Sequence, residues 1–172
     1  DQKGSGMFAD ESRTLKAGIL YFNSVVAREF LSHVCPTLDF SGGDIGRIPF
    51  LTNIGIDDKS QQIFQKLIDL SSVDWNAYER SWNFQSLPIL TASSEYSFTL
   101  ESSYTTWVTQ NREIVQEMKR LEEENNRIFI EAYGLQDELT PDVPLEEITL
   151  TCNPYYRYGG NKSEEELEAL LR

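Results

Sequence analysis

The sequence predicts an α+β protein in which helices dominate, with a small α/β lobe followed by a long helix and a helical tail. Two observations predict this class. A helical apolar pattern precedes a stretch with glycine and proline at positions 37–50, which is typical of turns and short strands. A second apolar pattern continues over positions 100–133, long enough for one continuous helix. We therefore expect a lobe at 1–73 and a helical region at 74–172.

The first helix is expected over Leu15–Val34. Its apolar residues lie mostly three or four positions apart, and a proline two positions beyond it disfavours further helix. Thr37–Phe40 is expected to be a short strand and Ser41–Asp44 a turn. Ile45–Phe50 is expected to be an edge strand, because Pro49 has no N–H to donate to a neighbouring strand.

A second helix is expected to begin at Asp57 or Asp58, since a carboxylate there can cap the first turn. Its buried side would consist of apolar residues at helical spacing: Ile63, Phe64, Leu67, Ile68 and Leu70. A short third helix is expected over Asp74–Arg80. Ser81–Ser97 has no sustained period and is expected to be a packed connector.

Leu100–Tyr133 carries residues at steps of three or four, close to a heptad repeat: Tyr104, Trp107, Asn111, Ile114, Met118, Leu121, Asn125, Ile128 and Ala132. We expect one helix, about 50 Å long at about 1.5 Å per residue, that buries Trp107, Ile114, Met118, Leu121 and Ile128. Asparagine in such a repeat costs stability and fixes register, and Gly134 is suited to end the helix. Two arrangements fit: a helix packed along a bundle, and a protruding coiled-coil arm.

The last part of the chain is expected to hold a strand at Ile148–Thr151 and a helix at Asn161–Arg172. Ser163 can cap this helix, and glutamates fill its first turn, where the helix dipole favours them. The helix continues to the last residue, and the chain opens without an initiator methionine. We therefore expect a piece of a longer protein.

The net charge of −13 is unevenly distributed. Residues 1–50 hold five basic and six acidic groups, residues 51–100 three and six, and residues 101–172 seven and sixteen. Because neutralised phosphates supply much of the affinity for nucleic acid, DNA contact is expected only from the first third. The chain opens with no signal peptide, and apolar runs such as Ala17–Leu20 are too short to span a bilayer, so no membrane contact and a cytoplasmic location are expected.

Metal and nucleophilic chemistry have little support in the sequence. Cys35 and Cys152 lie 117 positions apart, and His33 is the single histidine, so no zinc site is expected and the cysteines are interpreted as buried thiols. The glycines of Gly42-Gly43-Asp44 are not followed by the lysine and serine or threonine of a phosphate-binding loop.

One short motif is similar to a catalytic signature. Asn153-Pro154-Tyr155-Tyr156 resembles the Asn-Pro-Pro-Tyr motif of DNA amino-methyltransferases, in which the asparagine and first proline bind the amine of a flipped adenine and the aromatic ring stacks on it. Here Tyr155 replaces the second proline, and no glycine-rich loop is present to hold a methyl donor. A turn with packed tyrosines is the alternative and is favoured.

Four aromatic residues form a second cluster with two interpretations: Trp75, Tyr78, Trp82 and Phe84. Such rings can stack on bases. Without interleaved basic residues they belong more often to a core, and the core is the favoured interpretation.

Three longer stretches resemble one family. Phe8–Phe50 follows the pattern of a leucine-rich helix, "LNSK..FLS" and "NPTLNFQVGDI..IP"; Asp74–Phe84 (DWNAYERSWNF) resembles "DWDSFETSWDF"; and Asn125–Asp142 resembles "LNRIFIDIYGLQDELTPE". These patterns belong to the region after the catalytic domain in adenine-specific DNA methyltransferases of the BREX, or phage-growth-limitation, type. The first stretch is also loosely similar to target-recognition domains of type I specificity subunits.

The resemblance implies a parent enzyme that transfers a methyl group from S-adenosylmethionine to adenine N6 in phage defence or restriction-modification. The family's catalytic motifs lie upstream, so this segment is expected to hold no cofactor and to be a non-catalytic part that positions target DNA and docks. Its partners would be double-stranded DNA, its own catalytic domain and other defence-system subunits.

The expected DNA contacts lie around the recognition-like lobe: Lys3, Ser5, Arg13, Lys16 and Arg47. Arg47 can read guanine or phosphate, or can pair with Asp44 or Asp39 instead. Two other functions remain open. The segment can be a protein-interaction module for other defence subunits, which its acidity favours, or Asn153–Tyr156 can be a remnant active site.

Overall fold

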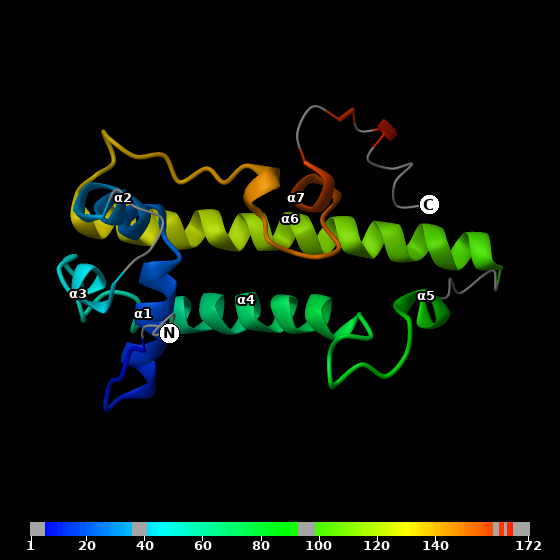
Figure 1. Ribbon diagram of the computed structural model, residues 1–172, viewed down its shortest axis with the longest axis horizontal. Coiled ribbons are helices and arrows are strands. Elements are labelled where there is room, and N and C mark those ends of the chain that lie inside the picture. Colours follow the sequence, from blue (N-terminus) through cyan, green and yellow to red (C-terminus); the bar gives the residue numbers. More distant parts are fainter. Residues whose placement is uncertain (1–5, 36–40, 93–98, 160–161, 164, 167–172) are drawn as a thin grey trace. The chain divides into compact units, whose positions relative to one another are not determined.

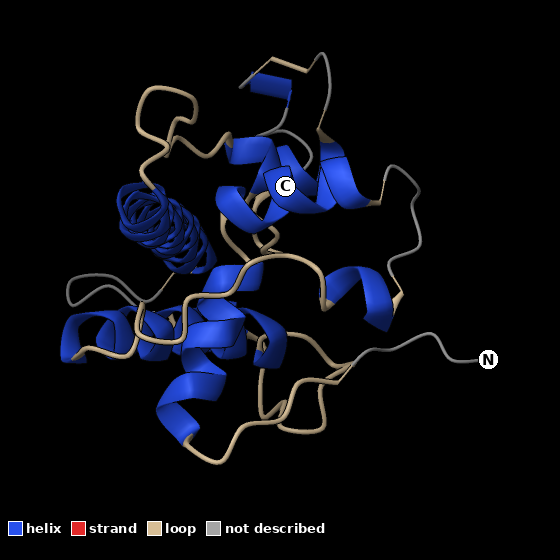
Figure 2. Cartoon of the chain, turned by 90° about the vertical axis from the view of Figure 1, so that its left-hand side faces the viewer, coloured by secondary structure: helices blue, strands red, loops and turns tan. Residues whose placement is uncertain are grey.

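The computed structural model describes residues 6–35, 41–92, 99–159, 162–163 and 165–166. Within these ranges the chain forms helices and loops, and no strand occurs (Figure 2). The α-helices, labelled in Figure 1, are α1 (Ser12–Phe22), α2 (Val25–Val34), α3 (Gly42–Ile45), α4 (Asp58–Asn76), α5 (Pro88–Thr91), α6 (Leu100–Tyr133) and α7 (Pro154–Tyr158), with a 3-10 helix η1 (Leu145–Glu147). The predicted α+β class is therefore wrong.

The edge strand expected at Ile45–Phe50 is replaced by the end of α3 and a turn. Ser41 begins α3 with a capping box, in which its hydroxyl accepts from the Asp44 N–H and the Asp44 carboxylate accepts from the Ser41 N–H. The Pro49 carbonyl accepts hydrogen bonds from the phenols of Tyr21 and Tyr133 at 2.7 and 2.6 Å. Side chains thus satisfy backbone groups that a neighbouring strand was expected to satisfy. The strand expected at Thr37–Phe40 lies outside the described residues.

The single helix expected over Leu15–Val34 is two helices. Ser24 interrupts it: its hydroxyl donates to the Tyr21 carbonyl at 2.6 Å and accepts from the Ala27 N–H at 3.3 Å, so it caps α2. The apolar stripe continues across this break, and periodicity alone therefore did not reveal it. Serine competes with the helical hydrogen-bond pattern in this way.

Helix α4 begins as expected, with the Asp57 carboxylate accepting from the N–H and hydroxyl of Ser60 at 3.0 and 2.6 Å. Ile63 is buried, but Ile68 is 41 % exposed and does not belong to the buried side. No separate helix forms over Asp74–Arg80, because α4 continues to Asn76 before the chain turns. The connector that follows contains the short α5.

Helix α6 has the expected bounds and is followed by Gly134, whose φ of +70° is the left-handed conformation that glycine adopts most readily. Of the five side chains expected to be buried, Met118 and Leu121 are buried and the others are partly buried. The buried face is wider than the repeat and includes Val115, Phe129 and Ile130. The helix therefore packs into a core, as in the bundle alternative.

The described residues pack as two units, and each takes one part of α6. The first unit comprises residues 1–66 and 121–142. Its centre is Tyr21, whose ring lies 5.3–5.8 Å from four other rings, centroid to centroid: Phe22, Phe50, Phe129 and Tyr133. Burial and the neighbouring Tyr133 hydroxyl raise the pKa of Tyr21 well above its ordinary value.

The second unit comprises residues 67–120 and 143–172. Its buried core consists of Val115, Met118, Val143, Ile148, Leu150 and Cys152. The strand expected at Ile148–Thr151 is absent. The N–H groups of Thr151 and Cys152 donate instead to the buried Asp74 carboxylate, at 2.7 and 2.8 Å. This segment is thus fixed to α4 through a side chain.

Near the end of the chain, only the first part of the expected helix Asn161–Arg172 is described. There Ser163 and Glu166 exchange hydrogen bonds between side chain and backbone, as expected for a cap at Ser163. In the described parts of the chain, no helix is both long enough and apolar enough to cross a membrane. The role of residues 1–73 as a recognition lobe stays a prediction.

Candidate nucleic-acid interface

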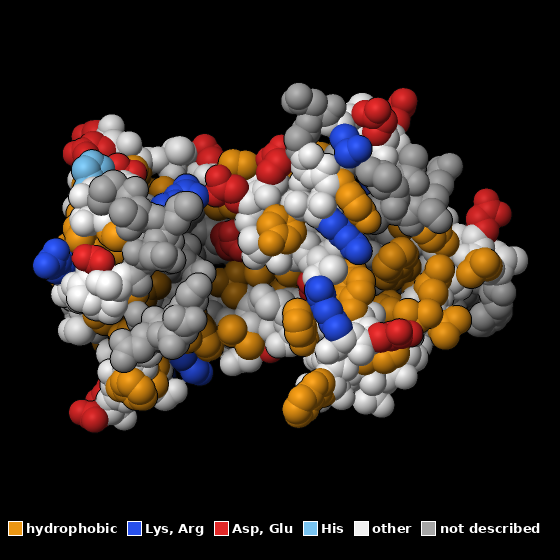
Figure 3. All heavy atoms as spheres, in the orientation of Figure 1, with side chains coloured by type: hydrophobic (Ala, Val, Ile, Leu, Met, Phe, Trp, Pro, Cys, Tyr) orange, Lys and Arg blue, Asp and Glu red, His pale blue; other side chains and the backbone are white. Residues whose placement is uncertain are grey.

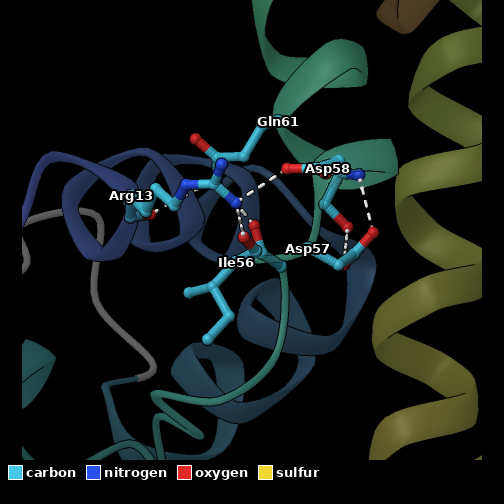
Figure 4. Close-up of polar contacts among 7 residues, drawn as sticks. Arg13, Ile56, Asp57, Asp58 and Gln61 are labelled. Carbon is cyan, nitrogen blue, oxygen red and sulfur yellow. Dashed lines mark hydrogen bonds and ion pairs between the residues drawn. The ribbon is translucent and has the colours of Figure 1, made fainter.

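Arg13, on α1, is one of the expected DNA contacts, and the fold already uses its guanidinium (Figure 4). Nη1 donates to the Ile56 carbonyl at 3.0 Å and lies 2.9 Å from Asp58 Oδ1. The Gln61 amide bonds the same region, donating to the carbonyls of Gly55 at 2.9 Å and Arg13 at 3.4 Å. This arginine therefore holds the loop before α4 against α1. Because its guanidinium is already used in these contacts, Arg13 is a weaker candidate for reading a DNA base.

Gly55 allows this close approach of loop and helix. Its φ is +79°, and a Cβ atom at this position would lie 3.2 Å from the Cβ of Ala17. A side chain here would be strained by the backbone conformation and crowded by α1. The Arg13 contacts thus hold the loop and α1 together at a close approach that Gly55 makes possible.

Lys16 lies one turn after Arg13 on α1. Its ammonium group is 5.3 Å from the ring centroid of Phe64 on α4, a cation–π distance. No carboxylate partner is found for Lys16 among the described residues, and the residue is partly buried in the first unit. By contrast, Lys59 pairs with Glu124 at 2.7 Å, and this contact raises the pKa of Lys59.

Arg47 follows α3 and is 72 % exposed in its side chain. Its nearest carboxylate is Asp44, 3.7 Å away, a long contact between groups on one turn. The hydroxyl and N–H of Ser41 hold the pKa of Asp44 below its ordinary value, and Arg47 contributes less. The guanidinium is therefore weakly held and accessible.

The expected contacts are thus only partly brought together. Arg13 and Lys16 share one helix, whereas no described contact joins Arg47 to either of them. Lys3 and Ser5 lie outside the described residues. The five positions remain predictions as DNA contacts.

Asn153 is buried and caps α7, so its amide is already occupied. Its Oδ1 accepts from the Tyr155 N–H at 3.1 Å, and its Nδ2 donates to the carbonyls of Leu145 and Ile148 at 2.7 and 2.8 Å. Pro154 starts the helix, where a missing N–H costs nothing. The motif is thus explained as a structural cap, with Tyr156 49 % exposed.

Of the aromatic cluster expected to be core, Trp75 and Trp82 lie at the surface, whereas Tyr78 and Phe84 are partly buried. Trp75 is 51 % exposed and Trp82 fully exposed. The Arg80 guanidinium lies 4.6 Å from the ring of Trp75 and 5.5 Å from that of Tyr78. Arg80 is the interleaved basic residue that the sequence interpretation overlooked, and its position between Tyr78 and Trp82 was the available signal.

An open surface depression of about 380 Å³ lies in the first unit and is lined by Asn53, Ile54, Gly55, Asp57, Ile128, Glu131 and Ala132. This lining offers no aromatic ring to stack a nucleobase and no cation to hold a phosphate. Its Asp57 carboxylate is already bonded to Ser60. The depression therefore lacks the groups that a nucleic-acid site uses to stack bases and hold phosphates. No cluster of His, Cys, Asp and Glu suited to a metal occurs among the described residues.

The chain is similar to part of two bacterial adenine-specific methyltransferases. It is 33 % identical over 152 residues to the adenine-specific methyltransferase PglX of Lacticaseibacillus casei (strain Zhang), across 87 % of this chain and 12 % of that protein. It is 29 % identical over 167 residues to the adenine-specific methyltransferase BrxX of Escherichia coli O9:H4 (strain HS), across 96 % of this chain and 13 % of that protein. The chain thus spans about an eighth of the length of these curated relatives. No protein-family model matches it.

Proposed function

We propose that this chain is a non-catalytic segment of a bacterial adenine-specific DNA methyltransferase of the BREX phage-defence type, and that it positions target DNA for the catalytic domain. The similarity to PglX and BrxX over 87 and 96 % of the chain carries this proposal. The parent enzyme would act in the cytoplasm on double-stranded DNA and take its methyl group from S-adenosylmethionine.

The non-catalytic role is supported by Asn153. A residue that binds the amine of a flipped adenine needs a free acceptor beside an open pocket. The Asn153 oxygen instead accepts from the Tyr155 N–H, and the side chain is fully buried. S-adenosylmethionine would bind in the part of the parent enzyme outside this segment.

The positioning role is supported by two weakly paired cations in an otherwise acidic chain. Arg47 has a single long contact to Asp44, and Lys16 has no carboxylate partner among the described residues. Both belong to the first unit. The catalytic domain would supply the remaining positive charge that duplex binding requires.

Methylation by the full-length parent enzyme tests the non-catalytic role. Tyr156→Ala removes the ring that would stack on the base in the catalytic motif, and it leaves the Asn153 cap in place. We expect a kcat within about two-fold of the unmodified enzyme. A loss of about 100-fold at unchanged affinity for S-adenosylmethionine would assign Tyr156 to the active site and refute this part of the proposal.

Affinity for duplex DNA in the same full-length enzyme tests the positioning role. Arg47→Ala should weaken binding by about 1–3 kcal/mol with relaxed sequence preference if Arg47 reads a base. If Arg47 contacts phosphate, binding should weaken equally for all sequences, with a shallower salt dependence. Unchanged affinity and methylation pattern in Arg47→Ala and Lys3→Ala would contradict a DNA-positioning role.

The second candidate function is a protein-interaction module that docks other defence-system subunits. The net charge of −13 favours it, because an acidic surface repels DNA. Gel shifts at low salt separate the two candidates. Retardation of duplex DNA that Arg47→Ala reduces supports positioning, and the absence of any shift at low salt supports the interaction module.

A further inference from the structure

Exposed apolar side chains concentrate in the second unit. Eight of the twelve large hydrophobic side chains that are exposed in the described residues lie there: Ile68, Val73, Trp75, Trp82, Leu87, Leu90, Leu100 and Tyr156. Figure 3 shows hydrophobic and basic side chains side by side on the right-hand part of the face drawn. Single exposed apolar residues are common, but a grouping of this kind marks an interaction surface.

Trp82 projects from a turn that hydrogen bonds hold in place. The buried Ser81 hydroxyl donates to Asn76 Oδ1 at 2.6 Å and accepts from the Asn83 N–H at 3.2 Å. The Phe84 N–H donates to the Ser81 carbonyl at 3.2 Å. Because the backbone of this turn is fixed, binding through Trp82 would cost little backbone freedom.

Arg80 is fixed beside this turn. Its Nη2 donates to the Thr151 hydroxyl at 2.8 Å, and its guanidinium stacks on Trp75. Thr151 is itself held by the Asp74 carboxylate at 2.7 Å. The surface therefore combines tryptophan, tyrosine and arginine on a rigid base, the composition that dominates binding energy at protein–protein interfaces.

A second arginine, Arg157, lies on α7, and its guanidinium is 5.4 Å from the ring centroid of Tyr158. Burial raises the pKa of Tyr78 to about 12, and the charges of Arg157 and Arg80 lower it by a smaller amount. Neither arginine forms an ion pair with a described residue. In this chain of net charge −13, Arg13, Arg47 and Arg120 each contact a carboxylate. Two unpaired arginines therefore point to a partner that supplies carboxylates.

The composition favours protein over DNA as that partner. Residues 67–120 and 143–172 hold seven basic and thirteen acidic groups, a net charge of −6, which opposes binding to a phosphate backbone. Leu87 and Leu90 can fill apolar pockets but cannot stack on bases. This chain covers only 12–13 % of the length of its relatives, so most of a parent polypeptide of that length lies outside it and can supply the partner surface.

We propose that the surface formed by Trp75, Arg80, Trp82 and Arg157 docks against the remaining polypeptide of the parent methyltransferase, at an apolar patch that carries carboxylates. This proposal rests on the proposed function, since it requires a parent enzyme. The docking holds the second unit to the enzyme independently of any contact with DNA.

Hydroxyl-radical footprinting of the full-length parent enzyme tests this docking. The oxidation rate of Trp82 is measured in the folded enzyme without DNA and compared with its rate in the same enzyme unfolded in urea. If the surface is docked, the folded rate should be at least about ten-fold lower. Similar rates in the two states would overturn the proposal, because Trp82 is fully exposed when uncovered. Protection that arises only after duplex DNA is added would also overturn it and assign the surface to nucleic acid.

Charge reversal supplies a second test in the same enzyme. Arg157→Glu leaves the Arg80–Thr151 hydrogen bond intact and places a carboxylate opposite the partner's carboxylates. We expect this variant to lose most of the Trp82 protection, whereas the control Lys66→Glu, at an exposed position in the first unit, should retain it. Full protection in Arg157→Glu would refute the carboxylate-bearing partner. The readout is independent of methylation, so failure here is distinguishable from failure of the proposed function.

Discussion

The Asn126 side chain on α6 caps α2, because its Oδ1 accepts a hydrogen bond from the backbone N–H of Val25 at 2.9 Å. Its Nδ2 donates to the Pro141 carbonyl at 3.0 Å, so one amide connects three segments of the first unit. The preceding residue, Asn125, donates to the Leu20 carbonyl at 2.9 Å, and its own oxygen is buried without a hydrogen bond. Two neighbouring asparagines thus fix the corner between α1 and α2.

Replacing Asn126 by alanine should cost about 2–3 kcal/mol of stability, because the Val25 N–H and the Pro141 carbonyl both lose their partner. Asn125→Ala is the matched control and should cost less, since it removes one hydrogen bond together with an unsatisfied oxygen. Urea denaturation of the two variants measures the difference. Equal costs would contradict the role given to Asn126.

The sequence predicted α6 well because its signal is local and long. The repeat and the glycine at its end determine the bounds, whereas the partners of its side chains depend on the tertiary fold. Asn125 belonged to the repeat, where asparagine was expected to cost stability and fix register. Asn126 lies one position away, and nothing in the periodicity indicates that it caps another helix 101 residues earlier.

The strands were mispredicted for a related reason. Glycine, proline and short apolar runs indicate extended or turning backbone, but they do not show which groups bond that backbone. The Pro49 carbonyl accepts from two tyrosines, and the N–H groups of Thr151 and Cys152 donate to a carboxylate. In a β-sheet, a neighbouring strand would satisfy these backbone groups. Here side chains satisfy them, so no strand forms at either place.

Asp74→Asn should destabilise the second unit by about 1–3 kcal/mol, because an amide offers one acceptor oxygen where the carboxylate offers two. One of the N–H groups of Thr151 and Cys152 would then face an NH₂ group. Hydrogen exchange at these two amides provides the measurement. Faster exchange at both is expected, with unchanged exchange at Val25 in the first unit as the control. Unchanged exchange at Thr151 and Cys152 would show that the backbone holds this segment without Asp74.

Stability should fall above pH 9. Burial, with a smaller effect of Asp74, raises the pKa of Cys152 from 9.0 to about 12, and burial raises that of Tyr78 from 10.0 to about 12. Since the folded protein keeps these protons to a higher pH than the unfolded chain, the stability is complete below pH 9 and is lost between about 9 and 12. Cys152→Ala should move the onset from about 9 to about 10, and urea midpoints across this range measure it. An unchanged onset in the variant would contradict the assignment to Cys152.

At the candidate site, the sequence pattern does not distinguish an arginine that supports the fold from one that is accessible to a ligand. Arg13 and Arg47 are both charged residues in the least acidic third of the chain, and both were expected to contact DNA. In the fold, Arg13 bonds the Ile56 carbonyl and Asp58, whereas Arg47 has one long contact within its own turn. The aromatic cluster was misjudged in the opposite direction, because an exposed Trp82 and a core tryptophan have the same local sequence signal.

Arg13→Ala and Arg47→Ala should therefore affect different properties of the protein. Loss of Arg13 removes a charge-assisted hydrogen bond to Ile56 and an exposed ion pair with Asp58, so local stability should fall by about 1 kcal/mol. Hydrogen exchange in the first turn of α4 should accelerate accordingly. Loss of Arg47 removes only a 3.7 Å surface contact, so the stability should change by less than about 0.5 kcal/mol while DNA affinity of the parent enzyme falls. The two measurements together separate folding from recognition. If Arg13→Ala left exchange in α4 unchanged and weakened DNA binding more than Arg47→Ala does, Arg13 would be the contact residue and the loop would be held without it.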